Sequence, residues 1–174
     1  MGFDHIGLKT ADVDKLSAFY LKALAPLGYR KIMQPMPHVV GLGTCGPSFW
    51  LAGPCPEQQA ALEKVASESE DTKTSSWPVS TPIHVAFSTR SRAAVRAFHK
   101  AALEAGAKCN GPPGFRPEYF SLYYAAYVTD PEGRNIEAVC MLPGIWSEDG
   151  PFWSLISGVA VAVAAGATKW WGIW

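Results

Sequence analysis

Apolar and polar positions in the first part of the chain follow two different periods. Residues 4–10 alternate and are rich in side chains that favour extended backbone, which predicts a strand. Over residues 11–25 the apolar positions recur at helical spacing, and they are Val13, Leu16, Phe19, Tyr20, Ala23 and Leu24. Short strand candidates separated by Pro and Gly then follow at residues 29–33, 39–43 and 48–52. The segment therefore predicts a β-α-β-β-β unit.

The same order returns in the second part of the chain. A strand is expected at residues 83–89 and a helix at 91–105, with Val95, Phe98, Ala102 and Leu103 on its buried face. Residues 110–117 are rich in Gly and Pro and are interpreted as a loop. A strand at 122–128, a tight turn at 130–133 and a last strand at 135–141 complete the unit. Its second strand has only a weak signal.

The two units also match residue by residue. A shift of 79 positions superposes His5 on His84, Thr10 on Thr89, and Phe19 on Phe98. A repeat of this length implies two copies of one supersecondary unit. A histidine at the same place in both first strands suggests a shared site, and Glu137 in the last strand is a third candidate. Two imidazoles and one carboxylate form a metal-ligand set.

These elements predict an α+β fold in one domain, since the chain has 174 residues, enough to bury a core. The domain is expected over residues 1–143, built from units 3–53 and 82–141. Residues 54–81 form a linker with a short polar helix at its start, and residues 144–174 form a separate apolar tail. The competing architecture is a ferredoxin-like sandwich, which also repeats β-α-β.

Composition narrows the function classes. Apolar residues make up 48% of the chain and aromatic residues 12%, which excludes a disordered protein. The 15 basic and 15 acidic residues cancel, and no basic run is present, so a nucleic-acid partner is not expected. The four cysteines form no C-x-x-C pair and the start of the chain lacks a signal-peptide pattern. Both features favour a cytoplasmic location with free thiols.

The tail has a composition unlike the rest of the chain. Residues 152–168 are apolar and uncharged, and Lys169 with several tryptophans follows. As a helix this stretch would span about 25 Å, slightly less than the core of a bilayer. Two interpretations stay open: a membrane contact through residues 152–174, or an apolar helix that packs on the domain or forms a homodimer contact. Its many small residues favour close helix packing.

Three motifs carry a resemblance to a known family. They are Asp4-His5-Ile6-Gly7, Ile83-His84-Val85-Ala86-Phe87, and the segment from Tyr127 to Glu137 that contains Asp-Pro-Glu-Gly. On these residues the chain resembles the vicinal oxygen chelate superfamily, which includes glyoxalase I, type I extradiol dioxygenases, fosfomycin-resistance thiol transferases, methylmalonyl-CoA epimerase and bleomycin-binding proteins. The resemblance implies that the two β-α-β-β-β units form one curved, barrel-like mixed sheet with the helices outside.

The resemblance also implies a ligand set and a substrate class. His5, His84 and Glu137 would hold a divalent metal (Fe²⁺, Mn²⁺, Zn²⁺ or Ni²⁺), and the substrate would be a small molecule with adjacent oxygen atoms. A fourth ligand of the glyoxalase pattern falls at Trp50, and an indole cannot ligate a metal. The set is therefore a triad with open positions. Tyr127, which belongs to the third motif, is the candidate catalytic residue.

The leading functional hypothesis is a metal-dependent, glyoxalase-like lyase or isomerase. An extradiol-type ring-cleaving dioxygenase is the second enzyme hypothesis. The sequence pattern of those dioxygenases includes a histidine a few residues before the third motif, and residues 118–121 contain none. The rival from another class is a metal-free small-molecule binding protein like those that confer bleomycin resistance.

Overall fold

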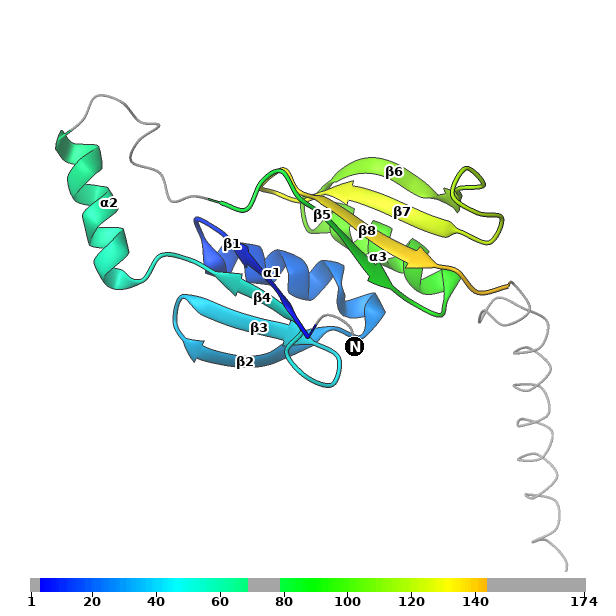
Figure 1. Cartoon of the computed structure of the whole chain (residues 1–174), viewed down its shortest axis with the longest axis horizontal. Helices are drawn as coiled ribbons and strands as arrows, with labels where there is room; N and C mark the ends of the chain where they lie inside the picture. The colour runs from blue at the N-terminus through cyan, green and yellow to red at the C-terminus, as the bar shows by residue number, and fades with distance from the viewer. Residues whose placement is uncertain (1–3, 69–78, 144–174) are drawn as a thin grey trace, which may run out of the picture.

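Two copies of one β-α-β-β-β order run through the computed structural model, which describes residues 4–68 and 79–143 (Figure 1). The elements of the first unit are β1 (Ile6–Lys9), α1 (Val13–Ala23), the 3-10 turn η1 (Ala25–Leu27), β2 (Arg30–Met36), β3 (Val39–Gly43) and β4 (Phe49–Ala52). Those of the second are β5 (His84–Ser88), α3 (Arg92–Glu104), β6 (Lys108–Phe115), β7 (Tyr124–Thr129) and β8 (Asn135–Cys140). Between the units lies α2 (Pro56–Glu68), which stands apart from both sheets (Figure 1).

Each unit forms its own four-stranded mixed sheet. The strand order is β1-β4-β3-β2 in the first and β5-β8-β7-β6 in the second. In both, the first and last strands of the unit pair in parallel, and the other pairs are antiparallel. The α+β class and the two β-α-β-β-β units are thus confirmed. The strands form two separate hydrogen-bonded sheets, one in each unit, and the curved sheet that was expected is made of these two parts. The ferredoxin-like alternative does not match this order.

The helices cover one face of the sheets. Helix α1 begins after Asp12, whose side chain accepts a hydrogen bond from the Lys15 amide at 2.9 Å. Helix α3 begins after Ser91, which caps it in the same way. The helices pack against each other and against the sheets. Their apolar faces supply much of the core, with Leu16, Phe19 and Tyr20 from α1 and Val95, Phe98 and Ala102 from α3. We call the face of each sheet that the helices do not cover the open face.

Strand β6 replaces the loop that was expected at residues 110–117. That expectation was wrong because Pro112 and Pro113 argue against a strand only where both edges must be paired. Strand β6 is an edge strand that pairs with β7 alone. Its register shifts on either side of Gly111, as in a bulged edge. The irregularity determines which side chains of the second unit reach the open face.

A buried arginine joins the two units. Arg134 is fully buried and contacts the Asp130 carboxylate at 2.9 Å. Its guanidinium also donates to the backbone carbonyls of Lys9, at 2.6 Å, and Ser80, at 2.8 Å. The Tyr20 hydroxyl donates to the same Asp130 at 2.7 Å, so helix α1 is included. Arg134 therefore connects the β7–β8 turn to the first unit.

The ends of the predicted organisation fall partly outside the described residues. The polar helix expected at the start of the linker is present as α2. The tail at 144–174, with both interpretations of it, lies outside the described residues. Within the described part of the chain, no helix is long and apolar enough to cross a membrane.

Candidate functional site

Strand β5 presents alternate side chains to the core and to the open face. Val85 and Phe87 are 7% and 6% exposed and belong to the core, so His84 and Ala86 face the other side. In the parallel pair of β5 and β8, Ala86 lies opposite Glu137. Glu137 therefore shares the open face with His84, and the two sequence-distant residues become neighbours.

His84 and Glu137 are in direct contact. The His84 Nε2 atom lies 3.0 Å from Glu137 Oε2, and the other carboxylate oxygen accepts a hydrogen bond from the Tyr123 hydroxyl at 2.7 Å. Glu137 is only 2% exposed, whereas about half of the His84 side chain is exposed, 48%. Burial, and then Glu137, raise the pKa of Tyr123. The result is a buried carboxylate held by a phenol and an imidazole, with the imidazole open to solvent.

Tyr127 lies beside this carboxylate. It is the cross-strand neighbour of Glu137 in the antiparallel pair of β7 and β8. Its ring centroid is 6.3 Å from that of His84. Burial, and then the negative charge of Glu137, raise the pKa of Tyr127 to about 12. The phenol is therefore protonated at neutral pH and can donate a hydrogen bond to a bound oxygen.

His5 shares a cleft with His84 but does not contact Glu137. The cleft has a volume of about 580 Å³ and lies between the starts of the two first strands, where Asp4, His5, Tyr29 and Ser48 face residues of β5. The Nδ1 atom of His5 lies 2.6 Å from the Asp4 carboxylate, and the His5 ring packs edge-on near Trp50 at 6.4 Å. His5 thus lines the same cleft as His84, but its carboxylate partner is Asp4 and not Glu137.

The donor set fits a divalent cation in its chemistry, since two imidazoles and a carboxylate are suitable ligands. Two of these donors, His84 and Glu137, already touch. Among residues 4–68 and 79–143, however, no three His, Cys, Asp or Glu side chains form a group that could hold a metal. Because Nδ1 of His5 is bonded to Asp4, His5 would have to ligate through its other ring nitrogen, Nε2. The three-residue ligand set therefore stays a prediction.

Trp50 occupies the place in the first sheet that Glu137 has in the second. Gly7 of β1 pairs with Trp50 of β4, just as Ala86 of β5 pairs with Glu137 of β8. This register confirms that Trp50 stands at the position of the first unit that corresponds to Glu137 in the second. The Trp50 ring lies over Gly41, where an added Cβ would come within 3.0 Å of the ring. A large apolar side chain thus replaces a donor at this position.

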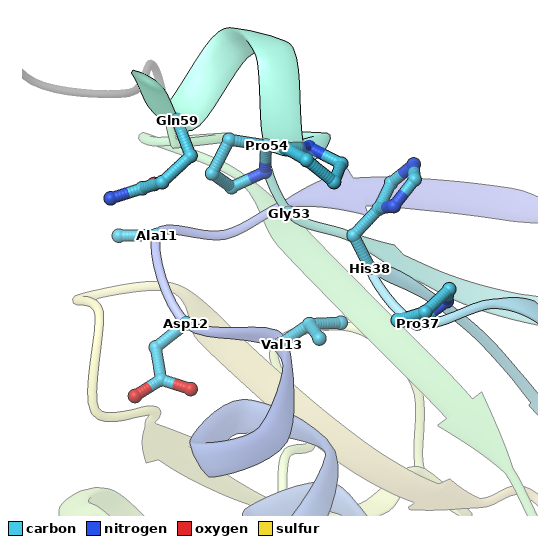
Figure 2. A pocket seen from close by; sticks show the side chains of 9 residues that line it. Ala11, Asp12, Val13, Pro37, His38, Gly53, Pro54 and Gln59 are labelled. Atoms are coloured by element: carbon cyan, nitrogen blue, oxygen red, sulfur yellow. The ribbon is translucent and has the colours of Figure 1, made fainter. Parts of the chain in front are cut away.

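A second cavity lies on the other side of the first unit. It has a volume of about 460 Å³ and is bounded by the start of α1, the β2–β3 turn and the start of α2. Figure 2 shows Ala11, Pro54 and His38 around it, with the Asp12 carboxylate pointing away from His38. The Nδ1 atom of His38 is buried without a hydrogen-bond partner among the described residues. The walls of this cavity are mostly Pro, Ala and Val side chains, and none of the predicted metal ligands lines it.

Two further residues of the open face were not part of the predicted site. Tyr123 directly contacts Glu137, and Arg116 places its guanidinium carbon 5.5 Å from the centroid of the Tyr127 ring. The alternation along β7 could have identified Tyr123, because it shares the parity of Tyr127. Arg116 follows the segment that was expected to be a loop, so no strand period could assign its side chain to this face.

Comparisons with known proteins support the fold strongly. No family model and no curated protein sequence matches the chain. Among solved structures, a glyoxalase/bleomycin resistance protein from Albidiferax ferrireducens T118 is 23% identical and superposes with a TM-score of 0.59, over 81% of this chain and 98% of that one. A glyoxalase/bleomycin resistance protein/dioxygenase family enzyme from Burkholderia phytofirmans PsJN is 22% identical with a TM-score of 0.56, over 82% and 100%.

The chain has the vicinal oxygen chelate fold. A glyoxalase-related enzyme from Fulvimarina pelagi also matches, at 17% identity and a TM-score of 0.54, over 80% of this chain and 88% of that one. Because one fold carries many different reactions, the function of this protein must be argued from its own side chains.

Proposed function

We propose that this protein is a metal-dependent, glyoxalase-like lyase or isomerase that acts on a small molecule with adjacent oxygen atoms. The observation that supports it most directly is the pair of His84 and Glu137, 3.0 Å apart on the open face of the second sheet. A buried carboxylate is costly unless its charge is paired, and a cation bound beside His84 would supply that opposite charge. A cleft of about 580 Å³ adjoins His84 and is large enough for a small substrate.

His84, Glu137 and His5 would hold the metal. When bound there, a divalent ion would act as a Lewis acid toward the two adjacent oxygens of a substrate. Trp50 supplies no donor, so the three residues would leave positions free for that substrate. His5 would ligate through Nε2, with its Nδ1–H group donating to Asp4.

The chain's own residues have separable tasks. The Tyr123 hydroxyl fixes one oxygen of Glu137, which leaves the other oxygen directed at His84. Tyr127 is protonated at neutral pH, and in this proposal it would donate a hydrogen bond to a substrate oxygen. Ala86 is a small, exposed residue of the same face that lines the cleft, and it would leave space there for the substrate.

The first prediction concerns metal content. Protein purified without chelators should contain about one equivalent of a divalent metal, because two imidazoles and a carboxylate bind such an ion. Elemental analysis should show that His84→Ala and Glu137→Gln each remove most of it. His99→Ala, which changes a histidine of α3 far from these donors in the chain, is the matched control and should retain the metal. Only traces of metal in the wild type, unchanged by these substitutions, would contradict the proposal.

A metal-free binding protein is the second candidate, and Trp50 favours it. At the register position of Glu137 the first sheet carries an indole, and the His5 ring packs near that indole. Such a face suits a planar ligand better than an ion. Wild-type protein without metal that still binds aromatic compounds, with loss of affinity in Trp50→Ala, would establish this alternative. Oxygen uptake with catechols in the presence of Fe²⁺ would instead identify an extradiol-type dioxygenase.

A further inference from the structure

Arg116 is fixed on the open face of the second sheet. Its Nη1 atom donates to the Phe115 carbonyl at 3.0 Å and its Nη2 atom donates to the Pro112 carbonyl at 2.7 Å. The guanidinium lies over the ring of Tyr127 and is half-buried. Both hydrogen-bond partners are neutral carbonyls, which position the positive charge and do not balance it.

The backbone of β6 is shaped to leave room for this arrangement. A Cβ at Gly111 would lie 2.8 Å from Cδ2 of Tyr127 and 3.4 Å from Nη2 of Arg116. A Cβ at Gly114 would lie 3.0 Å from Nη1 of Arg116. Larger residues at these two positions would displace the arginine and the tyrosine. The two glycines explain why the guanidinium can lie flat against the sheet at this point.

The arginine is also close to the proposed site. Tyr127 is its neighbour on one side and the cross-strand partner of Glu137 on the other. A molecule that contacts His84 and extends across the Tyr127 ring would therefore meet the guanidinium. An arginine fork with N–H groups to spare binds a carboxylate in preference to a neutral group.

We propose that Arg116 is a specificity-determining residue that binds an anionic group of the substrate, a carboxylate at the end remote from the adjacent oxygens. The inference rests on the proposed function, because it assumes that the adjacent oxygens lie at His84 and Glu137. It narrows the substrate class to small acids that carry vicinal oxygens at one end and a second negative charge at the other.

The test compares two probes that differ only in the distal charge. α-Ketoglutarate has adjacent oxygens at one end and a carboxylate at the other, and its 5-methyl ester has a neutral ester in place of that carboxylate. Calorimetric titration of the wild-type protein should show about tenfold tighter binding of the diacid, the size expected for one hydrogen-bonded charge pair. Arg116→Gln should abolish this preference and leave the affinity for the ester unchanged.

Two further variants separate position from charge. Gly114→Ala keeps the arginine and crowds its Nη1 atom, so it should weaken binding of the diacid while the fold is retained. Arg90→Gln removes an exposed positive charge that precedes α3 and should leave the preference intact. Retention of the full preference in Arg116→Gln, or equal binding of both probes by the wild type, would overturn the inference while the proposed function stands.

Acetate tests the arginine without the adjacent oxygens. Added at constant ionic strength, it should shift the NMR signal of the Arg116 Nε–H group in the wild type. If neither keto acid binds but acetate still shifts this signal, the proposed function fails and anion binding by Arg116 is retained. If acetate produces no shift and the wild type shows no preference for the diacid, the inference itself is wrong.

Discussion

At the scale of single residues, the register of the two sheets assigns opposite chemistry to equivalent positions. Glu137 supplies a buried carboxylate in the second sheet, and Trp50 supplies an indole in the first. The glyoxalase ligand pattern had placed Trp50 at this position, and the register agrees; a strand shifted by one residue would have turned every side chain to the other face. The contact between His84 and Glu137 follows from the same pairing.

The equivalence gives a prediction at Trp50. Trp50→Glu should add a negatively charged donor and tighten binding of a divalent metal by about tenfold or more, because affinity rises with the charge of the ligand set. Competition titration with a metal indicator measures this. Trp50→Phe, which keeps an aromatic ring over Gly41, is the control and should leave the affinity near the wild-type value. A folded Glu variant with unchanged affinity would show that the indole points away from the site.

At the scale of elements, the strands and helices follow from local signals with one exception. The caps of α1 and α3 and the Asp-Pro-Glu-Gly turn before β8 are local features, and local sequence is enough to predict them. Strand β6 is the exception, because its prolines are tolerated only at an edge, and edge position is a property of the whole sheet.

The cap of α1 provides a test at this scale. Asp12→Ala removes the acceptor of the Lys15 amide and should lower the free energy of unfolding by about 1 kcal/mol. Asp12→Asn keeps a capping oxygen and should change it by no more than a few tenths. Denaturant titration of the three proteins measures the difference. An Asn variant as unstable as the Ala variant would mean that the charge of Asp12, and not the hydrogen bond, stabilises the helix.

At the scale of the whole molecule, the buried Arg134 holds the two units together. It connects the β7–β8 turn to backbone carbonyls of Lys9 and Ser80, and Asp130 accepts from Tyr20 of α1. Removal of one partner of a buried ion pair leaves the other without compensation, which is more damaging than loss of an exposed pair.

Arg134→Met should therefore destabilise the protein by about 3–5 kcal/mol. Arg90→Gln, at an exposed arginine, should stay within about 0.5 kcal/mol of the wild type. Both are measured by denaturant unfolding. If Arg134→Met lowers the free energy of unfolding no more than Arg90→Gln does, Arg134 is not the connection between the units. The Met variant should also lose metal more readily, since His5 and His84 belong to different units.

The sequence by itself determined the two β-α-β-β-β units, the faces of their strands, and the candidates His5, His84, Glu137 and Tyr127. Periodicity and the repeat carry this information, since both depend on neighbours along the chain. Only the tertiary structure decided which candidates touch. It placed His84 against Glu137 and turned His5 to Asp4, and it brought Arg116 over Tyr127. These contacts depend on rotamers and on the close approach allowed by Gly111 and Gly114, and no sequence period encodes them.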